Sequence, residues 1–427
     1  MTLSPDIDAR AELQALIDAT PYGGTLDLPA GSYFVTRAGS AYYALRVPAG
    51  VRVRGNGTTI RQAPGIGASV RTFQMDGAGA TLEHLTGDGD AANQVVNEHE
   101  AFAFIAAPDC ALRKVVATNF MGDGLYVYTG GDRALIEGCT ATGNRRNGIT
   151  IAGGTGVRVY GGTFAGNAAQ QVDSEPGAGL TVNDVTIADA VIDCGSSAQF
   201  ALTISGSSST ARSTGWRVTG CTITGGINVV WADDVLIGTN TVTLPGALPV
   251  RVYRTSSRIT IARNTITQAN AAQGSYPSAI YVVGTGTGQA PDDVVITGNT
   301  IACAAPSALG VRLEGLLSAS VVGNGITGGN TAYSGGAGVY GRATNVNTPF
   351  ALMTVVGNTI TGFGQRGVSI QGNGAAQMTM LRAVGNTIGD AGTVQSAGMV
   401  LDDGTHALQA SNIVGNAYGA GVTSGAL

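Results

Sequence analysis

The sequence predicts an all-β protein, a single-stranded right-handed parallel β-helix built as a solenoid of about a dozen stacked coils. Three observations lead to this fold class. A strand-like pattern recurs every 23 to 31 residues from residue 101 onward, which is a typical length for one unit of a repeat protein. The same position of each strand is apolar, and an asparagine recurs in the turn after the next strand of the coil. Such a pattern predicts coils stacked around an elongated core.

The alternation of side chains along the recurring strands assigns one face of each strand to the core. Neighbouring residues of a strand point to opposite sides of the sheet, so an apolar second position marks the inward face. The third and fifth positions are then predicted to point outward, Ala103 and Ile105 among them. The second positions are Phe102, Leu125, Ile149, Val172, Leu202, Ile227, Val250, Ile280, Val311, Val339, Val368 and Met399.

An asparagine ladder is predicted at one corner of the coils. Stacked asparagines bond to one another and to the neighbouring backbone, which satisfies polar groups that would otherwise be buried without partners. Cys139 and Cys221 occupy the same slot in earlier coils and are expected to be small core residues. The ladder residues are Asn240, Asn264, Asn299, Asn324, Asn358, Asn386 and Asn416.

The first segment of the chain differs from the repeat. Residues 8–19, DARAELQALIDA, carry apolar residues at helical spacing and precede Gly23 and Gly24, which predicts a short amphipathic helix. Because the open end of a solenoid must be covered, we expect this helix to cap the first coil. The predicted organisation is a capping helix and entry turn over 1–24, followed by a right-handed parallel β-helix domain over 25–427.

Composition argues against several classes of function. The net charge of −5 is unfavourable for binding nucleic acid or an anionic membrane surface. The five cysteines lack any metal-ligand spacing, so we predict buried thiols and expect neither a metal nor a cofactor. The apolar runs are too short for membrane insertion, and the chain shows no secretory signal pattern.

Two segments carry a resemblance to known proteins. The opening DARAELQALIDATPYGGTLDLPAGSYFV is similar to the start of pectate-lyase-superfamily β-helix proteins, where a capping helix precedes Gly-Gly and a Leu-Pro-Ala-Gly turn. Within 123–176, DGLYVY, NRRNGITI and VDSEP resemble bacterial and phage tailspike-type polysaccharide depolymerases, although Ser174 replaces an apolar residue. The resemblance implies a polysaccharide substrate, a homo-oligomer that would be trimeric if tailspike-like, and an extracellular or virion-associated location.

The predicted outer face concentrates aromatic and charged side chains, although the whole chain is only 6% aromatic and 12% charged. Adjacent coils lie about 4.8 Å apart, close to the length of a sugar unit, so successive coils can form a row of subsites. Tyrosine offers a flat face to a sugar ring and a hydroxyl to its polar edge. Trp231 follows a strand, where packing explains it equally well. The candidate substrate-binding residues are Tyr126, Tyr128, Arg145, Arg146, Asn147, Asn228, Trp231, Arg251 and Tyr253.

Asp173 and Glu175 are the principal catalytic candidates. They stand two residues apart on one predicted strand and share its outer face, with Cα atoms about 7 Å apart. Their carboxyl groups can then lie anywhere in the range of about 5–9.5 Å that covers retaining and inverting glycoside hydrolases. Mutual repulsion is expected to raise one pKa and leave the other group ionised. The alternative is a solvated acidic pair bonded to Arg145 or Arg146.

A second polar column precedes three successive strands and consists of Glu100, Asp123 and Asn147. Glu100 and Asp123 are further catalytic candidates, as an acid, a base or part of a charge clamp on an acidic sugar. Asp123 and Asn147 can equally form the turn alone, by bonding backbone amides.

Three functions stay open from the sequence. The carboxylate pair favours an endo-acting glycoside hydrolase. A polysaccharide lyase or C5-epimerase acting on a uronate-containing glycan needs a base and a cation that stabilises the developing charge; Arg145, Arg146 or Arg251 with Tyr126 can supply these groups. The third candidate is a non-catalytic glycan-binding fibre or adhesin.

Overall fold

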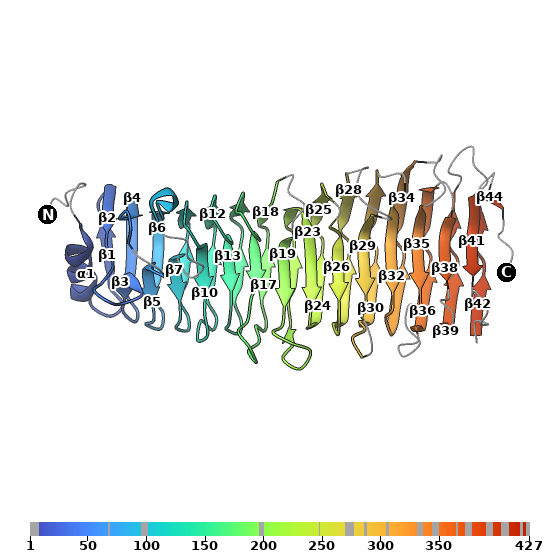
Figure 1. Ribbon diagram of the computed structural model, residues 1–427, viewed down its shortest axis with the longest axis horizontal. Coiled ribbons are helices and arrows are strands. Elements are labelled where there is room, and N and C mark those ends of the chain that lie inside the picture. The colour runs from blue at the N-terminus through green and yellow to red at the C-terminus, as the bar shows by residue number, and fades with distance from the viewer. Residues whose placement is uncertain are drawn as a thin grey trace. The chain divides into compact units, whose positions relative to one another are not determined.

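The structure is a computed structural model of the 427-residue chain. It divides into two compact units, Met1–Gly195 and Ser196–Leu427. Strands in both units wind as coils of a parallel β-solenoid, about 12 coils in all, which confirms the predicted fold class (Figure 1). The residues described are 8–66, 69–94, 101–195, 200–246, 248–269, 277–285, 288–304, 307–330, 336–343, 350–363, 366–371, 378–389, 396–402, 410–418 and 422–423.

In the first unit, each coil contributes to two parallel sheets, here called sheet B and sheet A. A short 3-10 helix, η1 (Ala91–Asn93), follows β6. Sheet B contains β3 (Tyr43–Val47), β5 (Arg71–Met75), β7 (Ala101–Ile105), β10 (Asp123–Val127), β13 (Ile149–Ile151) and β16 (Val172–Ser174). Sheet A contains β1 (Thr25–Leu28), β2 (Gly31–Val35), β4 (Arg52–Gln62), β6 (Thr81–Asp88), β8 (Ala111–Arg113), β9 (Val116–Thr118), β11 (Leu135–Glu137), β12 (Thr140–Thr142), β14 (Arg158–Tyr160), β15 (Thr163–Ala165), β17 (Thr186–Ala188) and β18 (Val191–Asp193).

The second unit is built in the same way. Its sheet B strands are β19 (Phe200–Ser205), β23 (Gly226–Val230), β26 (Val250–Tyr253), β29 (Ser278–Val283), β32 (Leu309–Glu314), β35 (Ala337–Arg342), β38 (Arg366–Gln371), β41 (Ser396–Asp402) and β44 (Val422–Thr423). Its sheet A strands are β20 (Ser213–Thr214), β21 (Arg217–Thr219), β22 (Thr222–Thr224), β24 (Ala232–Gly238), β25 (Thr241–Leu244), β27 (Ser257–Ala262), β28 (Thr265–Gln268), β30 (Asp292–Thr297), β31 (Thr300–Cys303), β33 (Ser318–Val322), β34 (Gly325–Asn330), β36 (Phe350–Val356), β37 (Thr359–Phe363), β39 (Met378–Val384), β40 (Thr387–Ile388), β42 (Ala410–Val414) and β43 (Ala417–Tyr418).

The predicted apolar column lines the core in both units. In the first unit Leu125 pairs with Ile149, which pairs with Val172 in the next coil. In the second unit Leu202 pairs with Ile227, and the column continues coil by coil. These side chains are fully buried, so the alternation of the sequence assigned the inward face correctly from β10 onward.

The first predicted coil, β7, is out of the predicted register by one residue. Ala103 pairs with Leu125 and Phe104 pairs with Tyr126. Ala103 and Ile105, which were expected to face outward, are fully buried. Every residue of AFAFI is apolar, so alternation alone does not decide which residues face the core.

Phe102 is buried, as predicted, but in a neighbouring column. Its ring packs against Phe73, with ring centroids 5.4 Å apart, and against Phe120 at 5.9 Å. This aromatic cluster fixes the register of β7 through packing partners that lie outside the repeat.

The asparagine ladder is confirmed in the second unit. Both the backbone N and the Nδ2 of Asn240 donate to Asn264 Oδ1, at 2.9 and 3.0 Å. The same paired bonds repeat from each ladder residue to the next as far as Asn416. Cys221 N donates to Asn240 Oδ1 at 2.9 Å, so this cysteine occupies the predicted slot. All five cysteines are buried free thiols.

The predicted capping helix is α1 (Arg10–Ala19), which buries Leu13 and Ile17. Gln14 Nε2 donates to the carbonyl of Arg46 at 3.0 Å, and Arg46 N donates to Gln14 Oε1 at 2.8 Å. The helix therefore satisfies backbone groups of the strand β3 at the sheet edge, where an unpaired edge would otherwise invite another chain. Within the described residues, no helix has the length and hydrophobicity needed to cross a bilayer.

Candidate functional site

Arg146 connects two of the predicted carboxylates in the first unit. Its Nη1 donates to Asp123 Oδ2 at 2.8 Å, and its Nη2 donates to Glu175 Oε2. Asp123 opens the sheet B strand β10, whereas Glu175 directly follows β16. One guanidinium therefore ties together residues from three successive coils.

Asn147 connects the third carboxylate to the same cluster. Its backbone N donates to Asp123 Oδ1 at 2.9 Å, and its Nδ2 lies 3.3 Å from Asp173 Oδ2 and 3.0 Å from Thr150 Oγ1. Gln170 N donates to Asn147 Oδ1 at 3.0 Å. Asn147 therefore forms the turn, as one interpretation of the sequence held, and also orients a predicted catalytic group.

Asp123 is completely buried, with a side chain 0% exposed. Burial raises its pKa to about 6, although the charge of Arg146 and the hydrogen bond from Asn147 act to lower it. Both of its oxygens are bonded inside the cluster. This geometry suits a group that positions Arg146 and Asn147 rather than one that touches a substrate.

Asp173 and Glu175 occupy contrasting surroundings on the same face. Asp173 is 8% exposed, and its pKa is raised to about 7 by burial and by the negative charge of Glu175, against the opposing effects of Arg146 and Asn147. The side chain of Glu175 is 49% exposed. A carboxyl that keeps its proton near neutral pH thus lies beside a carboxylate that is open to solvent.

The two neighbouring arginines have different positions. Burial lowers the pKa of Arg146, but the charges of Asp123 and Glu175 outweigh this and hold it above its usual range. Arg145 is exposed and makes no ion pair within the described part of the chain. The structure therefore brings Arg146 into the cluster and leaves Arg145 outside it.

A second amide ladder supports the turns that carry this cluster. Asn144 Oδ1 accepts a hydrogen bond from Phe120 N at 3.0 Å, and Asn144 Nδ2 donates to Asn167 Oδ1 at 2.8 Å. Asn167 Nδ2 donates to Gln171 Oε1 at 2.7 Å. Sequence analysis missed this ladder because it spans few coils, but the Gly-Asn pairs at 143–144 and 166–167 were a usable signal.

Aromatic side chains form a shelf beside the carboxylates. The Tyr126 ring stacks on Phe104, with centroids 5.1 Å apart and planes at 17°, and Tyr128 lies 5.3 Å from Phe104. Tyr128 is 45% exposed, whereas Tyr126 is buried. Arg71 places its guanidinium carbon 3.6 Å from the centroid of Phe104. The sequence missed Phe104 because of the register error at β7, and Arg71 because it precedes the recognised repeat.

The other predicted binding residues lie in the second unit. Arg251 Nε donates to Asn228 Oδ1 at 3.0 Å, and its guanidinium carbon lies 4.7 Å from the centroid of Tyr253. Trp231 is covered by Arg254, at 4.2 Å from guanidinium carbon to ring centroid. In this group two arginines therefore cover the aromatic rings of Tyr253 and Trp231.

Glu100 lies outside the described residues. Among the residues that are described, no group of three or more His, Cys, Asp or Glu side chains is arranged to hold a metal ion. The described cluster of the first unit combines three carboxyl groups, those of Asp123, Asp173 and Glu175, with the cation of Arg146.

Comparisons with known proteins bear on the fold. The family described as "Right handed beta helix region" matches residues 103–223. A search of curated protein sequences found no match. The matched segment contains the whole carboxylate cluster, from Asp123 to Glu175.

Solved structures show a similar arrangement of the chain at low sequence identity. A mutant tailspike protein of E. coli bacteriophage HK620, in complex with a pentasaccharide, is 13% identical with a TM-score of 0.50, covering 96% of this chain and 77% of that one. A mannuronan C-5 epimerase A-module of Azotobacter vinelandii is 18% identical with a TM-score of 0.48, covering 97% and 96%. The catalytic unit of an α-1,3-glucanase from Streptomyces thermodiastaticus is 15% identical with a TM-score of 0.45, covering 98% and 67%. The chain has the fold of a right-handed parallel β-helix protein.

Proposed function

We propose that this protein is a polysaccharide-degrading glycoside hydrolase whose chemistry is carried by Asp173 and Glu175. The observation that carries the proposal is the contrast between these two groups. Burial and a neighbouring charge raise the pKa of Asp173 to about 7, while the Glu175 carboxylate is half exposed and paired with Arg146. A buried carboxyl group that can donate a proton, beside an exposed carboxyl group, is what acid/base cleavage of a glycosidic bond requires.

Asp173 is assigned the role of general acid. It donates its proton to the glycosidic oxygen as the bond from that oxygen to the anomeric carbon breaks. Glu175 then either takes a proton from the attacking water or attacks the anomeric carbon itself and is released by water. In both cases one water is consumed, and its hydrogen and hydroxyl end on the two product chains.

Asp123, Asn147 and Arg146 are assigned positioning roles. Arg146 holds Glu175 in place, while Asn147 fixes the carboxyl of Asp173 at 3.3 Å. Asp123 is fully buried and bonds both residues. Because hydrogen bonds already fix these side chains, little further conformational freedom is lost in the transition state, and this favours the reaction.

The aromatic shelf supports an extended glycan as the substrate. Tyr128 offers an exposed ring, backed by Phe104, next to the carboxylates. Tyrosine rings stack well on the apolar faces of sugars. A substrate that covers this shelf and the carboxylates occupies several coils, which fits cleavage within a polymer, outside the cell or on a virion.

The electrostatics argue against Tyr126 and Arg146 as the base of the lyase and epimerase alternative. That chemistry needs a base able to remove a proton next to a uronate carboxyl. Burial and nearby carboxylates raise the pKa of Tyr126 to about 12, and the paired carboxylates hold the pKa of Arg146 above its usual range. Neither group is a suitable base near neutral pH.

Neutral variants test the assignment once a screen of purified polysaccharides has identified a cleaved substrate. Asp173→Asn and Glu175→Gln should each lower turnover by about 10²-fold or more, with glycan affinity near that of the wild type and no fall in melting temperature. Glu137→Gln, which alters an exposed glutamate on sheet A, should retain full turnover. Full activity in both neutral variants, or glycan binding without any product, would contradict the proposal.

A further inference from the structure

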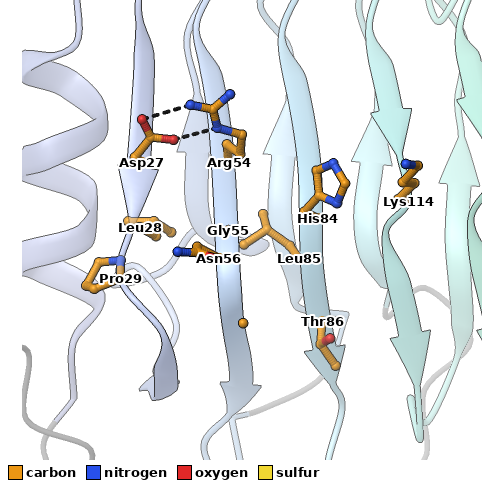
Figure 2. Close-up of a pocket in the computed structure, with 11 residues that line it drawn as sticks. Asp27, Leu28, Pro29, Arg54, Gly55, Asn56, His84, Leu85, Thr86 and Lys114 are labelled. Atoms are coloured by element: carbon orange, nitrogen blue, oxygen red, sulfur yellow. Dashed lines mark hydrogen bonds and ion pairs between the residues drawn. The ribbon is translucent and has the colours of Figure 1, made fainter.

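A groove with a volume of about 830 Å³ lies on sheet A of the first unit, away from the sheet B strands that carry the carboxylates. Its walls come from β1, β4, β6 and the turn between β8 and β9. Figure 2 shows Asp27, Arg54, His84 and Lys114 on successive coils along it. The lining residues are Asp27, Leu28, Pro29, Arg54, Gly55, Asn56, Gly57, His84, Leu85, Thr86 and Lys114.

The strand register aligns the polar groups of the groove. Arg54 pairs with Asp27 on one side and with Glu83 on the other, and Glu83 pairs with Arg113. His84 and Lys114 directly follow the last two of these residues. The two basic side chains therefore stand one coil apart, about 4.8 Å along the stack.

Asp27, the acidic residue of the groove lining, does not neutralise Lys114. Asp27 is already bound by Arg54, whose Nε and Nη2 donate to its two oxygens at 2.6 and 3.0 Å. Lys114, the chain's single lysine, is exposed and makes no ion pair within the residues that the structure describes. The groove therefore presents an ammonium group without a counter-charge.

The backbone holds both basic residues in a disfavoured conformation. His84 has φ of 52° and Lys114 has φ of 50°, in the left-handed region that residues with a Cβ seldom adopt. In the next coil the same position is Gly138, with φ of 60°. Other residues with a Cβ also occupy this corner, since Asp189 has φ of 57° at the same position two coils after Gly138. The backbone therefore tolerates the basic side chains here without pointing to a ligand by itself.

The remaining lining combines apolar and polar surface. Pro29 is an exposed apolar residue of the lining, whereas Leu28 and Leu85 are buried in the core. Asn56 and Thr86 provide an amide and a hydroxyl. A sugar ring presents apolar C–H faces and hydroxyl edges, and an anionic substituent on it would pair with the ammonium group.

We infer that this groove is a second, non-catalytic binding site for an oligosaccharide segment that carries an anionic group. Lys114 and His84 contact the carboxylate or sulfate of the sugar, and Asn56 and Thr86 contact its hydroxyls. The inference stands independently of the hydrolase proposal, because none of these residues belongs to the carboxylate cluster.

The single lysine allows a direct test. Reductive methylation with ¹³C-formaldehyde labels Lys114 and the amino terminus only, and Lys114→Gln identifies the lysine signal by its loss. Trigalacturonate or a heparin-derived tetrasaccharide should shift that signal saturably, while neutral maltotriose should leave it in place. Inorganic phosphate should bind at least about tenfold more weakly. Absence of a shift with both acidic oligosaccharides, or phosphate binding as tightly as they do, would overturn the inference.

Two variants distinguish a loss of oligosaccharide binding from a loss of protein stability. Lys114→Gly should leave the melting temperature unchanged or higher, because glycine relieves the left-handed backbone, yet weaken binding of the acidic oligosaccharide at least about fivefold by calorimetry. Arg158→Gln, which alters an exposed arginine of β14 on the same sheet, should change affinity less than about twofold. Unchanged affinity in Lys114→Gly would overturn the assignment, whatever the outcome for turnover at Asp173.

Discussion

At the scale of single residues, the account depends on the protonation of Asp173. Its side chain is buried and Asn147 Nδ2 lies 3.3 Å from its Oδ2, and its pKa of about 7 is the physical basis for its proposed role as acid. The stacking of strands predicted which residues share the outer face. It did not predict how deeply each would be buried, because that depends on turn residues such as Asn147 that cover the sheet.

Turnover should therefore fall at alkaline pH. As pH rises through about 7, Asp173 loses the proton that it must donate. The rate of glycan cleavage under saturating substrate should decline above that pH, and a steady or increasing rate up to pH 9 would contradict the assignment of Asp173 as the acid.

The stability of the folded state should also depend on pH through the ionisation of Asp173. The pKa of Asp173 is higher in the folded state than in the unfolded chain, where it is about 3.9. Its contribution to stability is thus present below about pH 4 and is lost as pH rises toward 7. Asp173→Asn removes this dependence. The free energy of unfolding of the variant should therefore rise relative to that of the wild type by up to a few kcal/mol between pH 4 and pH 8, as measured by urea unfolding. A stability difference that does not change with pH would show that Asp173 ionises normally.

At the scale of elements, Arg146 joins turns from three coils. Arg146→Gln leaves Asp123 buried without its cation, which should cost about 3–5 kcal/mol at pH 8. The cost should shrink at pH 5, because Asp123, with a pKa of about 6, can then take up a proton. Denaturant unfolding at both pH values measures the effect.

Two comparisons sharpen this prediction. Arg145→Gln changes the neighbouring exposed arginine and should cost no more than about 0.5 kcal/mol. The double variant Arg146→Gln with Asp123→Asn should be less destabilised than the sum of the single variants, since the two residues interact directly. Equal effects at Arg145 and Arg146, or strict additivity, would remove Arg146 from its bridging role.

The asparagine ladder gives a second prediction at this scale. Asn299 accepts hydrogen bonds from Asn264 and donates to Asn324 and to the carbonyl of Ile261. Asn299→Leu should destabilise the protein by about 1–3 kcal/mol, because buried groups lose partners. Asn56→Leu, at an exposed asparagine, is the matched control and should change stability little. No difference between the two would mean that the ladder contributes nothing to folding.

The sequence predicted elements best where polar and apolar residues alternate. The inward column from Leu125 onward followed directly from this pattern. The ladder followed from the recurring asparagines, and the helix that buries Leu13 and Ile17 followed from apolar residues at helical spacing. In β7, AFAFI contains no polar residue, so its register is set by the packing of Phe102 against Phe73. That contact joins strands from different coils and has no counterpart in the local pattern.

At the scale of the molecule, the repeat explains how reactive side chains can gather on a few neighbouring coils while the other coils only build the solenoid. Each coil adds one strand to the same outer face, so a few substitutions in neighbouring coils place reactive groups side by side. The cluster formed by Asp123, Arg146, Asn147, Asp173 and Glu175 spans three such coils. Repeat periodicity predicted a common outer face for Asp173 and Glu175 and a separate turn column for Asp123 and Asn147. Pairing of the carboxylates with Arg145 or Arg146 was one interpretation of the sequence, whereas the bridge from Arg146 to both Asp123 and Glu175 required the structure.

The measurement that tests the central claim most directly is the origin of the oxygen in the product chains. Digestion of a cleaved polysaccharide in ¹⁸O-labelled water, followed by mass spectrometry, distinguishes addition of water from elimination. Hydrolysis by Asp173 and Glu175 predicts saturated products that carry one heavy oxygen for each bond cleaved, and loss of these products in Asp173→Asn. Unlabelled, unsaturated products with rising ultraviolet absorbance would contradict the account and identify the protein as a lyase.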